Sequence, residues 1–212
     1  MRIYKALLLF GYCYASCLYF RTQRIFLKRK NKILVAPLDW GLGHATRCIP
    51  IIRALKEQDA EIIIASDGNS QSLLKKEFPD LKFIELKGYE IKYPRSSPMA
   101  LSIFMQLPKI IFRIAKEHSQ LKRIIRKEEI DIVISDNRYG LWNKKIKTVF
   151  ITHQVMIKCP PILKFLEPIL FLLNKFFISQ FDECWVPDYS SDKNLSGDLS
   201  HKYHLPRNSL HF

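Results

Sequence analysis

The sequence predicts an α/β fold built on a doubly wound parallel sheet. Short runs rich in Ile and Val alternate along the chain with longer stretches of helical character, and these runs are apolar at nearly every position. Continuous apolar runs are typical of parallel strands that helices cover on both faces. The β-α-β-α order then indicates a parallel sheet with helices packed on either side.

The first half of this pattern contains two strand–helix units and a third strand. KILVAPL (32–38) is the first predicted strand, and a helix at 45–58 follows it after a turn with two glycines. EIIIASD (61–67) and a helix at 68–78 form the second unit, and KFIELK (82–87) is the third strand. Each strand is too short and too continuously apolar for an amphipathic helix.

The second half begins with a loop and a long helix. The segment KGYEIKYPRSSPM is rich in Gly, Pro and Ser and predicts a loop that leads into a helix at roughly 100–128. IDIVISD (130–136) and KTVFITH (147–153) are the next two predicted strands. A helix at 160–181 and the strand ECWVPD (183–188) complete the pattern, and the sequence contains no internal repeat.

Two of the predicted helices are unusually apolar. Residues 160–181 are interrupted only by Lys164, Glu167 and Lys175 among charged residues, and residues 99–116 have a similar character. The charges and Pro168 argue against a membrane-spanning helix. Either each segment is buried in the core, or its apolar side rests on a lipid surface.

The charge of the chain restricts its partners. The net charge is +14 and the pI is near 9.6, which indicates an anionic membrane surface or a phosphorylated substrate. Nucleic acid is not expected, because no zinc-finger spacing or aromatic RNA-binding motif accompanies the Lys and Arg residues. Five scattered cysteines without a CxxC pair argue against a disulfide framework and against a structural zinc site.

Residues 1–31 form a separate segment ahead of the predicted domain, residues 32–212. The apolar run from Ala6 to Phe20 is shorter than the ~20 residues of a membrane span, and a basic cluster follows it. By the positive-inside tendency, this order keeps the domain in the cytoplasm. The segment is either a membrane anchor or an extension that does not fold, and we expect a peripheral location on the inner face of the membrane.

Polar residues follow most of the predicted strands. In a doubly wound sheet the ligand lies beyond the carboxyl ends of the strands, where these residues would converge. They are Asp39 to His44, Asp67 to Asn69, Asp136 to Tyr139, His153 with Gln154, and Asp188.

The turn DWGLGHATR (39–47) is the strongest local signal. Gly41 and Gly43 allow the backbone to approach a ligand closely, and the following helix directs its positive end to the same place, which predicts an anion site. A dinucleotide site is an alternative, because Asp67 lies where a ribose-binding acid would be expected. Against it, Thr46 stands in place of the third glycine of that motif and a histidine interrupts it.

His44 and Arg47 add chemistry to this turn. A neutral imidazole beside an anion site can accept a proton from an attacking hydroxyl or amine, although a histidine at this place can also serve only to cap a helix. Arg47 can neutralise a phosphate or pair with an acidic side chain on the surface.

The stretch ILVAPLDWGLGHATRCIPIIRAL resembles the opening of bacterial glycosyltransferases with the two-domain GT-B fold. It is most similar to the family 28 group that includes the peptidoglycan N-acetylglucosaminyltransferase. ISDNRYG (134–140), TVFITHQ (148–154) and ECWVPD (183–188) extend the resemblance, which covers roughly residues 32–212. It implies a single Rossmann-like domain that binds the acceptor, and a missing or separate domain that binds a nucleotide sugar such as a UDP-sugar.

The resemblance also implies an inverting reaction without a metal ion or cofactor. His44 would be the general base and Asp136 its orienting partner. The substrate-binding residues would be Gly41, Gly43, Arg47, Asn137, Tyr139, His153 and Gln154.

The resemblance leaves the state of the enzyme open. The expected donor half is absent, so the chain is either a truncated enzyme or one half of a two-chain enzyme. The split N-acetylglucosaminyltransferase of the eukaryotic dolichol pathway offers a parallel, with its membrane-anchored half. A lipid-linked or other membrane acceptor is expected. A non-catalytic anchored subunit that recruits a catalytic partner chain is the alternative.

Overall fold

The computed structural model of the chain describes residues 30–89, 99–155, 164–165, 167–188 and 210–211. The predicted segment 1–31 therefore lies almost wholly outside the described residues, as do parts of the predicted loop before residue 100 and of the predicted helix 160–181. Within the described ranges, no helix combines the length and the hydropathy that a membrane span requires.

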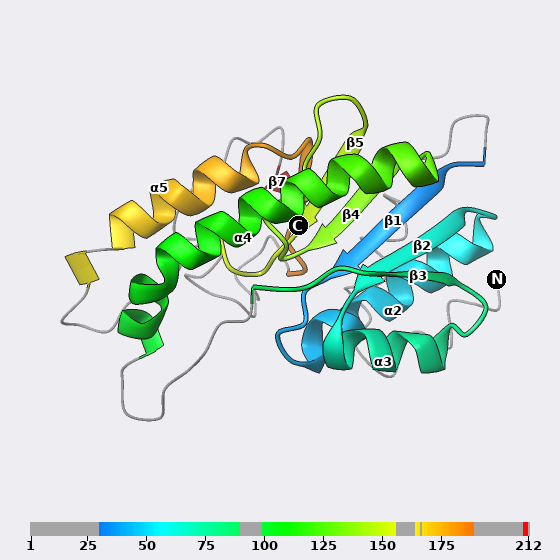
Figure 1. Ribbon diagram of the computed structural model, residues 1–212, viewed down its shortest axis with the longest axis horizontal. Helices are drawn as coiled ribbons and strands as arrows, with labels where there is room; N and C mark the ends of the chain where they lie inside the picture. The colour runs from blue at the N-terminus through cyan, green and yellow to red at the C-terminus, as the bar shows by residue number, and fades with distance from the viewer. Residues whose placement is uncertain (1–29, 90–98, 156–163, 166, 189–209, 212) are drawn as a thin grey trace.

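A seven-stranded sheet with only parallel pairs forms the centre of the molecule (Figure 1). The strands are β1 (Lys32–Pro37), β2 (Glu61–Ser66), β3 (Lys82–Glu85), β4 (Ile132–Asp136), β5 (Lys147–Ile151), β6 (Glu183–Trp185) and β7 (Leu210–His211). Their order is β3-β2-β1-β4-β5-β6-β7, so the chain winds outward from β1, returns to place β4 beside β1, and then winds outward in the other direction. The predicted doubly wound α/β fold is confirmed.

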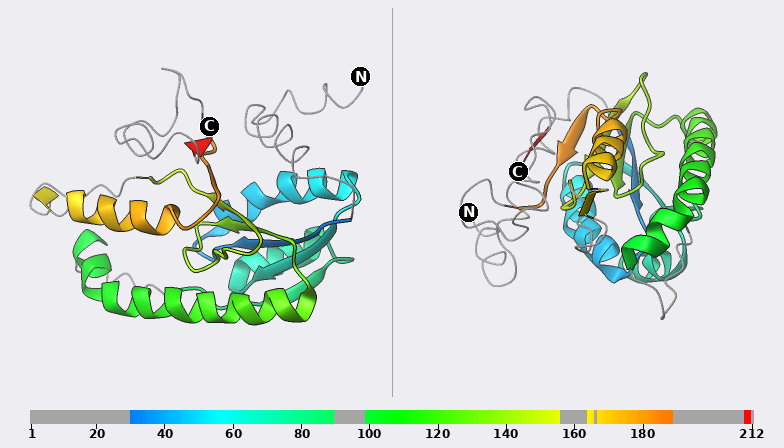
Figure 2. Two further views of the ribbon diagram at one scale, coloured as in Figure 1. Left: turned by 90° about the horizontal axis from the view of Figure 1, so that it is seen from above. Right: turned by 90° about the vertical axis from the view of Figure 1, so that its left-hand side faces the viewer.

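Helices cover both faces of this sheet (Figure 2). On one face α2 (Leu42–Glu57) and α3 (Gly68–Glu77) share a core with the sheet, and on the other face α4 (Met99–Glu128) and α5 (Glu167–Ile178) do the same. The molecule therefore has the three layers of a Rossmann-like domain.

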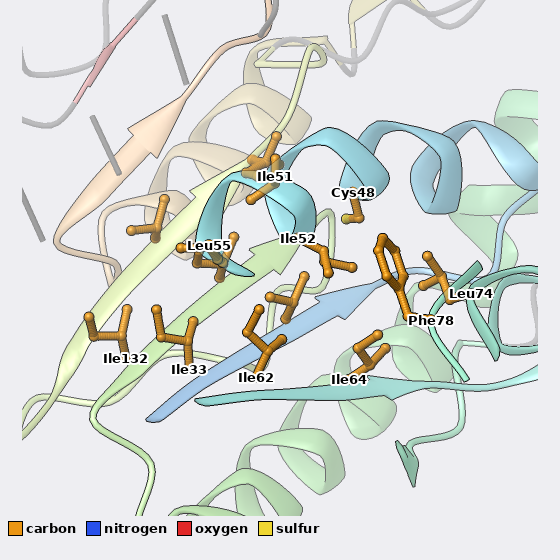
Figure 3. Close-up of a cluster of buried hydrophobic side chains, with 14 of the residues drawn as sticks. Ile33, Cys48, Ile51, Ile52, Leu55, Ile62, Ile64, Leu74, Phe78 and Ile132 are labelled. Carbon is orange, nitrogen blue, oxygen red and sulfur yellow. The ribbon is translucent and has the colours of Figure 1, made fainter. Parts of the chain in front are cut away.

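The core explains why the strand sequences are continuously apolar. Ile33 belongs to the cluster beneath α2, and its neighbour Leu34 belongs to the cluster beneath α4. Ile51, Ile52 and Leu55 of α2 pack onto the first of these faces (Figure 3). Successive side chains of a strand point to opposite faces, and both faces are buried here, so no position along the strand favours a polar residue.

The predicted elements agree with the structure in type and order, but some bounds differ. Of the predicted helix 160–181, the described residues contain α5 only at Glu167–Ile178. All six predicted strands are present, and β7 is an additional strand of two residues. The first helix begins at Leu42, three residues earlier than predicted, so Gly43 and His44 lie in its first turn. This early start brings His44 onto the same helix as Arg47.

Candidate active site

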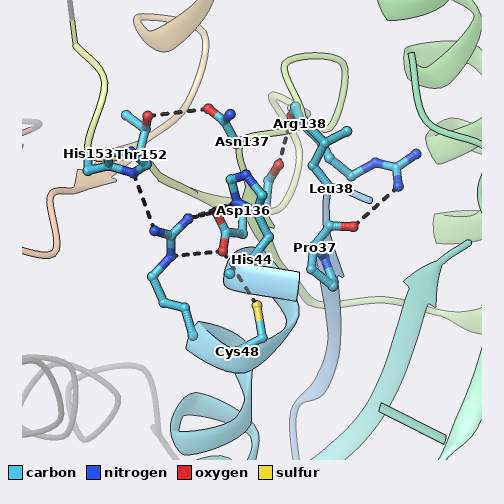
Figure 4. Close-up of polar contacts among 12 residues, drawn as sticks. Pro37, Leu38, His44, Cys48, Asp136, Asn137, Arg138, Thr152 and His153 are labelled. Atoms are coloured by element: carbon cyan, nitrogen blue, oxygen red, sulfur yellow. Dashed lines mark hydrogen bonds and ion pairs between the residues drawn. The ribbon is translucent and has the colours of Figure 1, made fainter. Parts of the chain in front are cut away.

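The site lies where the winding of the sheet changes direction. β1 and β4 are neighbours, and Pro37 at the end of β1 pairs in register with Asp136 at the end of β4. Each strand leads away into a connection on a different side, which leaves a crevice at such a switch point in doubly wound sheets. The first turn of α2 follows β1 and places its side chains over the end of β4 (Figure 4).

Of the two glycines in the turn, the backbone conformation requires a glycine at Gly41 and does not require one at Gly43. Gly41 is the N-cap of α2 and has φ 81° and ψ 166°, a conformation that is essentially restricted to glycine. Gly43 does not have a positive φ, and a Cβ on either glycine would meet no atom within 4 Å. The turn therefore borders open space, and Gly43 has no conformational reason to lack a side chain.

His44 and Asp136 form a hydrogen-bonded pair at this crevice. The Asp136 side chain is fully buried, the His44 side chain is about one tenth exposed, and His44 Nδ1 lies 3.0 Å from Asp136 Oδ1. A proton on Nδ1 that is donated to Asp136 leaves the lone pair on Nε2 available. This is the arrangement that a general base requires, and the structure brings the two predicted catalytic residues together.

Arg47 lies one turn after His44 on the same face of α2 and pairs with the same carboxylate. Its Nε donates to Asp136 Oδ2 at 3.0 Å and its Nη2 donates to Asp136 Oδ1 at 2.5 Å. Nη2 also lies 2.8 Å from His44 Nδ1. The guanidinium thus compensates the buried charge of Asp136, which would otherwise be costly to desolvate. The sequence predicts that Arg47 neutralises a phosphate or pairs with an acid on the surface. Its acidic partner in the structure is instead the fully buried Asp136.

His153 extends the cluster to β5. Its Nδ1 lies 3.3 Å from Arg47 Nη1, and the side chain is partly buried. Burial is the main cause that lowers the pKa of His153, and the nearby positive charges of Arg47 and His44 lower it further, against the opposing effect of Asp136. A neutral His153 can accept the Arg47 hydrogen bond.

Asn137 and Gln154 form hydrogen bonds within and between the loops around the cluster. Asn137 has φ 59°, and its Oδ1 accepts a hydrogen bond from Thr152 Oγ1 at 3.3 Å. The backbone N–H of Gln154 donates to the same hydroxyl oxygen at 3.0 Å. The backbone carbonyl of Gln154 accepts from Asn174 on α5. Their contacts here are with the protein, and their predicted role in substrate binding stays a prediction.

The Tyr139 ring lies apart from the His44–Asp136 pair. It packs against Phe150 and Phe177, with ring centroids 5.0 and 5.8 Å away, on the face of the sheet that α4 and α5 cover. Burial raises the pKa of its hydroxyl. The Tyr139 ring therefore contributes to the core beneath these helices rather than to the cluster over β4.

A buried ion pair lies beneath the site. It joins Arg138, one of the polar residues predicted at the end of the fourth strand, to Glu117, which the sequence did not suggest. Arg138 is fully buried, and its Nε donates to Glu117 Oε1 of α4 at 2.6 Å. The Arg138 guanidinium also donates to the carbonyl oxygens of Pro37, Leu86 and Lys87. These bonds tie the ends of β1 and β3 to the loop after β4. The only signal in the sequence is an arginine directly after a buried strand.

Glu117 is held on its second oxygen as well. Glu117 Oε2 accepts hydrogen bonds from the Tyr89 hydroxyl at 3.0 Å and from the Gly140 backbone at 2.9 Å. Burial first, and then the negative charge of Glu117, raise the pKa of Tyr89. The network is a rigid support for the loop that carries Asp136.

The acidic residues after β1 and β2 also have structural partners. Asp39 Oδ1 accepts a hydrogen bond from the Ser70 backbone at the start of α3, and Asp67 Oδ2 accepts one from the Gly88 backbone at 2.7 Å. Asp67 was the residue expected to bind a ribose in the alternative dinucleotide site. Its contact with Gly88 gives it a structural role at that place.

No family model and no curated protein matches the chain. Among solved structures it is similar to MurG of Acinetobacter baumannii, with 12% identity, a TM-score of 0.45, and coverage of 74% of this chain and 41% of that chain. The corresponding values for Glycyrrhiza uralensis UGT73P12, complexed with glycyrrhetinic acid 3-O-monoglucuronide, are 11%, 0.48, 74% and 44%. For a glycosyltransferase of Rickettsia africae they are 20%, 0.44, 76% and 38%.

The chain spans less than half the length of each of these neighbours.

Proposed function

We propose that the chain is the acceptor-binding half of an inverting glycosyltransferase that requires no metal ion. The observation that carries the proposal is the pairing of His44 with the buried Asp136, at a switch point and beside a glycine turn that borders open space. A core histidine would need neither the carboxylate partner nor the open surroundings. The sequence resemblance to GT-B transferases supports the same assignment.

The reaction is a single displacement at the anomeric carbon. His44 Nε2 accepts the proton of the acceptor hydroxyl as its oxygen bonds to the anomeric carbon. The bond from that carbon to the diphosphate oxygen breaks, and the bonding electrons leave with the diphosphate. Asp136 keeps the proton on Nδ1 and stabilises the imidazolium that forms. The N–H groups at the start of α2 favour the developing negative charge.

The donor in this proposal is a nucleotide sugar, with a UDP-sugar the first to test. It is bound by a second α/β domain, either in a further part of the same protein or in a partner chain. Without that domain His44 has no electrophile against which to activate an acceptor. The chain alone is therefore expected to bind acceptor and to transfer no sugar.

The acceptor is proposed to lie in or on an anionic membrane. Large apolar side chains on α4, on α5 and in the short turn at residues 164–165 have exposed fractions between 46% and 73%. The two helices extend together beyond the edge of the sheet (Figure 2). We call these side chains the apolar face, which consists of Met105, Ile111, Phe112, Phe165, Ile169, Leu172 and Phe176.

The charge of the chain supports lipid as the occupant of this face. The net charge is +14, and Lys109, Arg113 and Lys116 lie on α4 itself. Each basic residue near an anionic bilayer contributes about 1 kcal/mol to binding. Co-sedimentation with phosphatidylcholine vesicles, with and without phosphatidylglycerol, tests this. Leu172→Asp should weaken binding, whereas the control Ser72→Asp on α3 should not, and equal binding by both variants would argue against the face.

Sugar transfer to a membrane lipid extract tests the proposed function itself. A panel of labelled UDP-sugars is offered to the chain alone and to the chain together with the protein encoded by the neighbouring reading frame. Transfer that needs both proteins, and that is lost in His44→Ala but kept in the surface control Lys56→Ala, is the expected result. Transfer that His44→Ala leaves unchanged would remove His44 from the reaction. If no donor supports transfer, a non-catalytic recruiting subunit becomes the better account.

A further inference from the structure

Arg47 contacts Asp136, His44 and His153, and these side chains do not all need it at the same time. It forms two hydrogen bonds to Asp136, touches His44 Nδ1, and reaches His153 with its remaining nitrogen. Its side chain is about one eighth exposed, at the rim between the buried carboxylate and the open space by the glycine turn. The guanidinium thus pairs with an internal anion and remains partly accessible to an external one.

The hydrogen bonds around Asp136 Oδ1 cannot all be satisfied at once. This oxygen lies 2.5 Å from Arg47 Nη2 and 3.0 Å from His44 Nδ1, and the two nitrogens are 2.8 Å apart. If Nδ1 carries a proton, two N–H donors crowd against one another at a single acceptor. If Nδ1 carries none, it accepts from Arg47 but turns its lone pair toward the carboxylate. One unfavourable contact remains in either state.

Removal of Arg47 from the carboxylate resolves this conflict. Asp136 would then accept from His44 Nδ1 at Oδ1 and from the Cys48 thiol at Oδ2. A proton on Nδ1 is the tautomer that leaves Nε2 free for a proton. Asp136 is fully buried, so the guanidinium can leave only if His44 compensates the carboxylate or if the arriving ligand stabilises the new arrangement. A diphosphate, like a carboxylate, offers Arg47 two oxygens that accept a bidentate pair of hydrogen bonds.

We propose that Arg47 is an exchangeable clamp, which holds Asp136 in the free chain and moves to a diphosphate that binds at the glycine turn. After this movement Asp136 accepts the hydrogen bond from His44 Nδ1, which leaves His44 Nε2 free to accept a proton. Diphosphate binding is thereby coupled to the formation of the general base. This inference rests on the proposed function for the role of His44, but the exchange itself is a binding event that needs no sugar transfer. The diphosphate can belong to the nucleotide or to an isoprenoid-linked acceptor.

The exchange makes Asp136 a competitor of the ligand. Because the diphosphate must displace Asp136 from Arg47, removal of the carboxylate charge should tighten diphosphate binding although the site loses its predicted orienting residue. The gain in diphosphate-binding free energy in Asp136→Asn therefore measures how strongly the carboxylate opposes the ligand in the native chain. A general effect of net charge predicts the same gain from loss of any acid, wherever it lies.

Calorimetric titration of the full chain with inorganic pyrophosphate, UDP and farnesyl diphosphate separates these possibilities. Asp136→Asn should bind at least about fivefold more tightly than the native chain, the lower end of typical coupling. The control is Glu61→Gln, which removes one negative charge at the amino ends of the strands, away from the site, and should change diphosphate affinity little. Arg47→Gln should bind none of the three. If UDP binds and farnesyl diphosphate does not, the diphosphate belongs to the nucleotide, and the reverse result assigns it to an isoprenoid-linked acceptor. If neither binds, the proposal is overturned.

A spectroscopic arm keeps the test valid if Asp136→Asn fails to fold. The ring ¹⁵N signals of His44, assigned with His44→Gln, report which nitrogen carries the proton. Pyrophosphate should move them in the native chain, and the ligand-free spectrum of Arg47→Gln should already resemble that of the native complex. His44 signals that stay unchanged on pyrophosphate binding, or that differ between these two samples, would overturn the exchange. Loss of transfer in His44→Ala with no exchange would leave the proposed function intact.

Discussion

Replacement of Gly43 by alanine should make the chain more stable and weaken its binding of a diphosphate. Gly43 lies in the first turn of α2, it has no positive φ, and an added Cβ would meet nothing within 4 Å. Alanine is favoured over glycine in a helix by about 0.8–1 kcal/mol in the interior, and somewhat less is expected in the first turn. For a domain of this size, a gain of about 0.5–1 kcal/mol raises the Tm by roughly 1–4 °C.

The expected loss of diphosphate binding comes from the same open space. If a diphosphate approaches the backbone at this turn, the added methyl group lies in its path and weakens binding. Thermal unfolding and pyrophosphate titration of the same sample would measure both effects. A variant that is stabilised and still binds the ligand normally would refute the idea that Gly43 is kept small for a ligand.

Gly41 provides the matched comparison. Its φ of 81° and ψ of 166° fall in a region where a non-glycine residue costs on the order of 1–3 kcal/mol. Gly41→Ala should therefore lower the Tm, although its Cβ would also meet no atom within 4 Å. A Tm that falls by the same amount in both variants would mean that the two glycines serve the fold alike.

Three further predictions concern the buried polar groups. Arg138→Met should destabilise the chain by about 3–5 kcal/mol, because it leaves Glu117 buried without its cationic partner. Urea unfolding would measure this loss, and the double variant Arg138→Met/Glu117→Gln should recover part of it. Because folding lowers the pKa of His153, the unfolded chain binds that proton more readily, so stability should fall as the pH drops below about 6.5. His118, whose pKa burial also lowers, adds a loss of the same sign, so His153→Gln should reduce the slope of stability against pH without removing it. Asp136→Asn should slow sugar transfer by about 10²- to 10⁴-fold even though it tightens diphosphate binding, and steady-state kinetics with the complete enzyme would separate the two effects.

The sheet was predictable because each strand carries its own signal. Ile33 and Leu34 face opposite layers and are both fully buried, so the run is apolar at every position and needs no knowledge of its partners. The proximity of His44 and Asp136 followed from topology, because both lie at the carboxyl edge of a doubly wound sheet. β7 gave no signal, since two residues are too few to establish a pattern.

The pairing of the charged residues was less predictable. The role of Arg47 depends on the start of α2 at Leu42 and on the register that sets Asp136 beside Pro37, and neither can be read from the spacing of residues. The Arg138–Glu117 pair joins the loop after β4 to the middle of α4, and no periodic pattern connects the two. Sequence patterns report which face of an element is buried, but not which buried charges meet there.

The rate of sugar transfer by His44→Ala tests the central claim most directly. The complete enzyme, with its donor-binding half, would be assayed under single-turnover conditions with a saturating UDP-sugar, so that donor binding and product release do not limit the rate. The account predicts a fall of about 10²- to 10⁴-fold with a native Tm, as expected when a general base is removed. A rate equal to that of the native chain would contradict it and would leave the His44–Asp136 pair as a structural feature of the switch point.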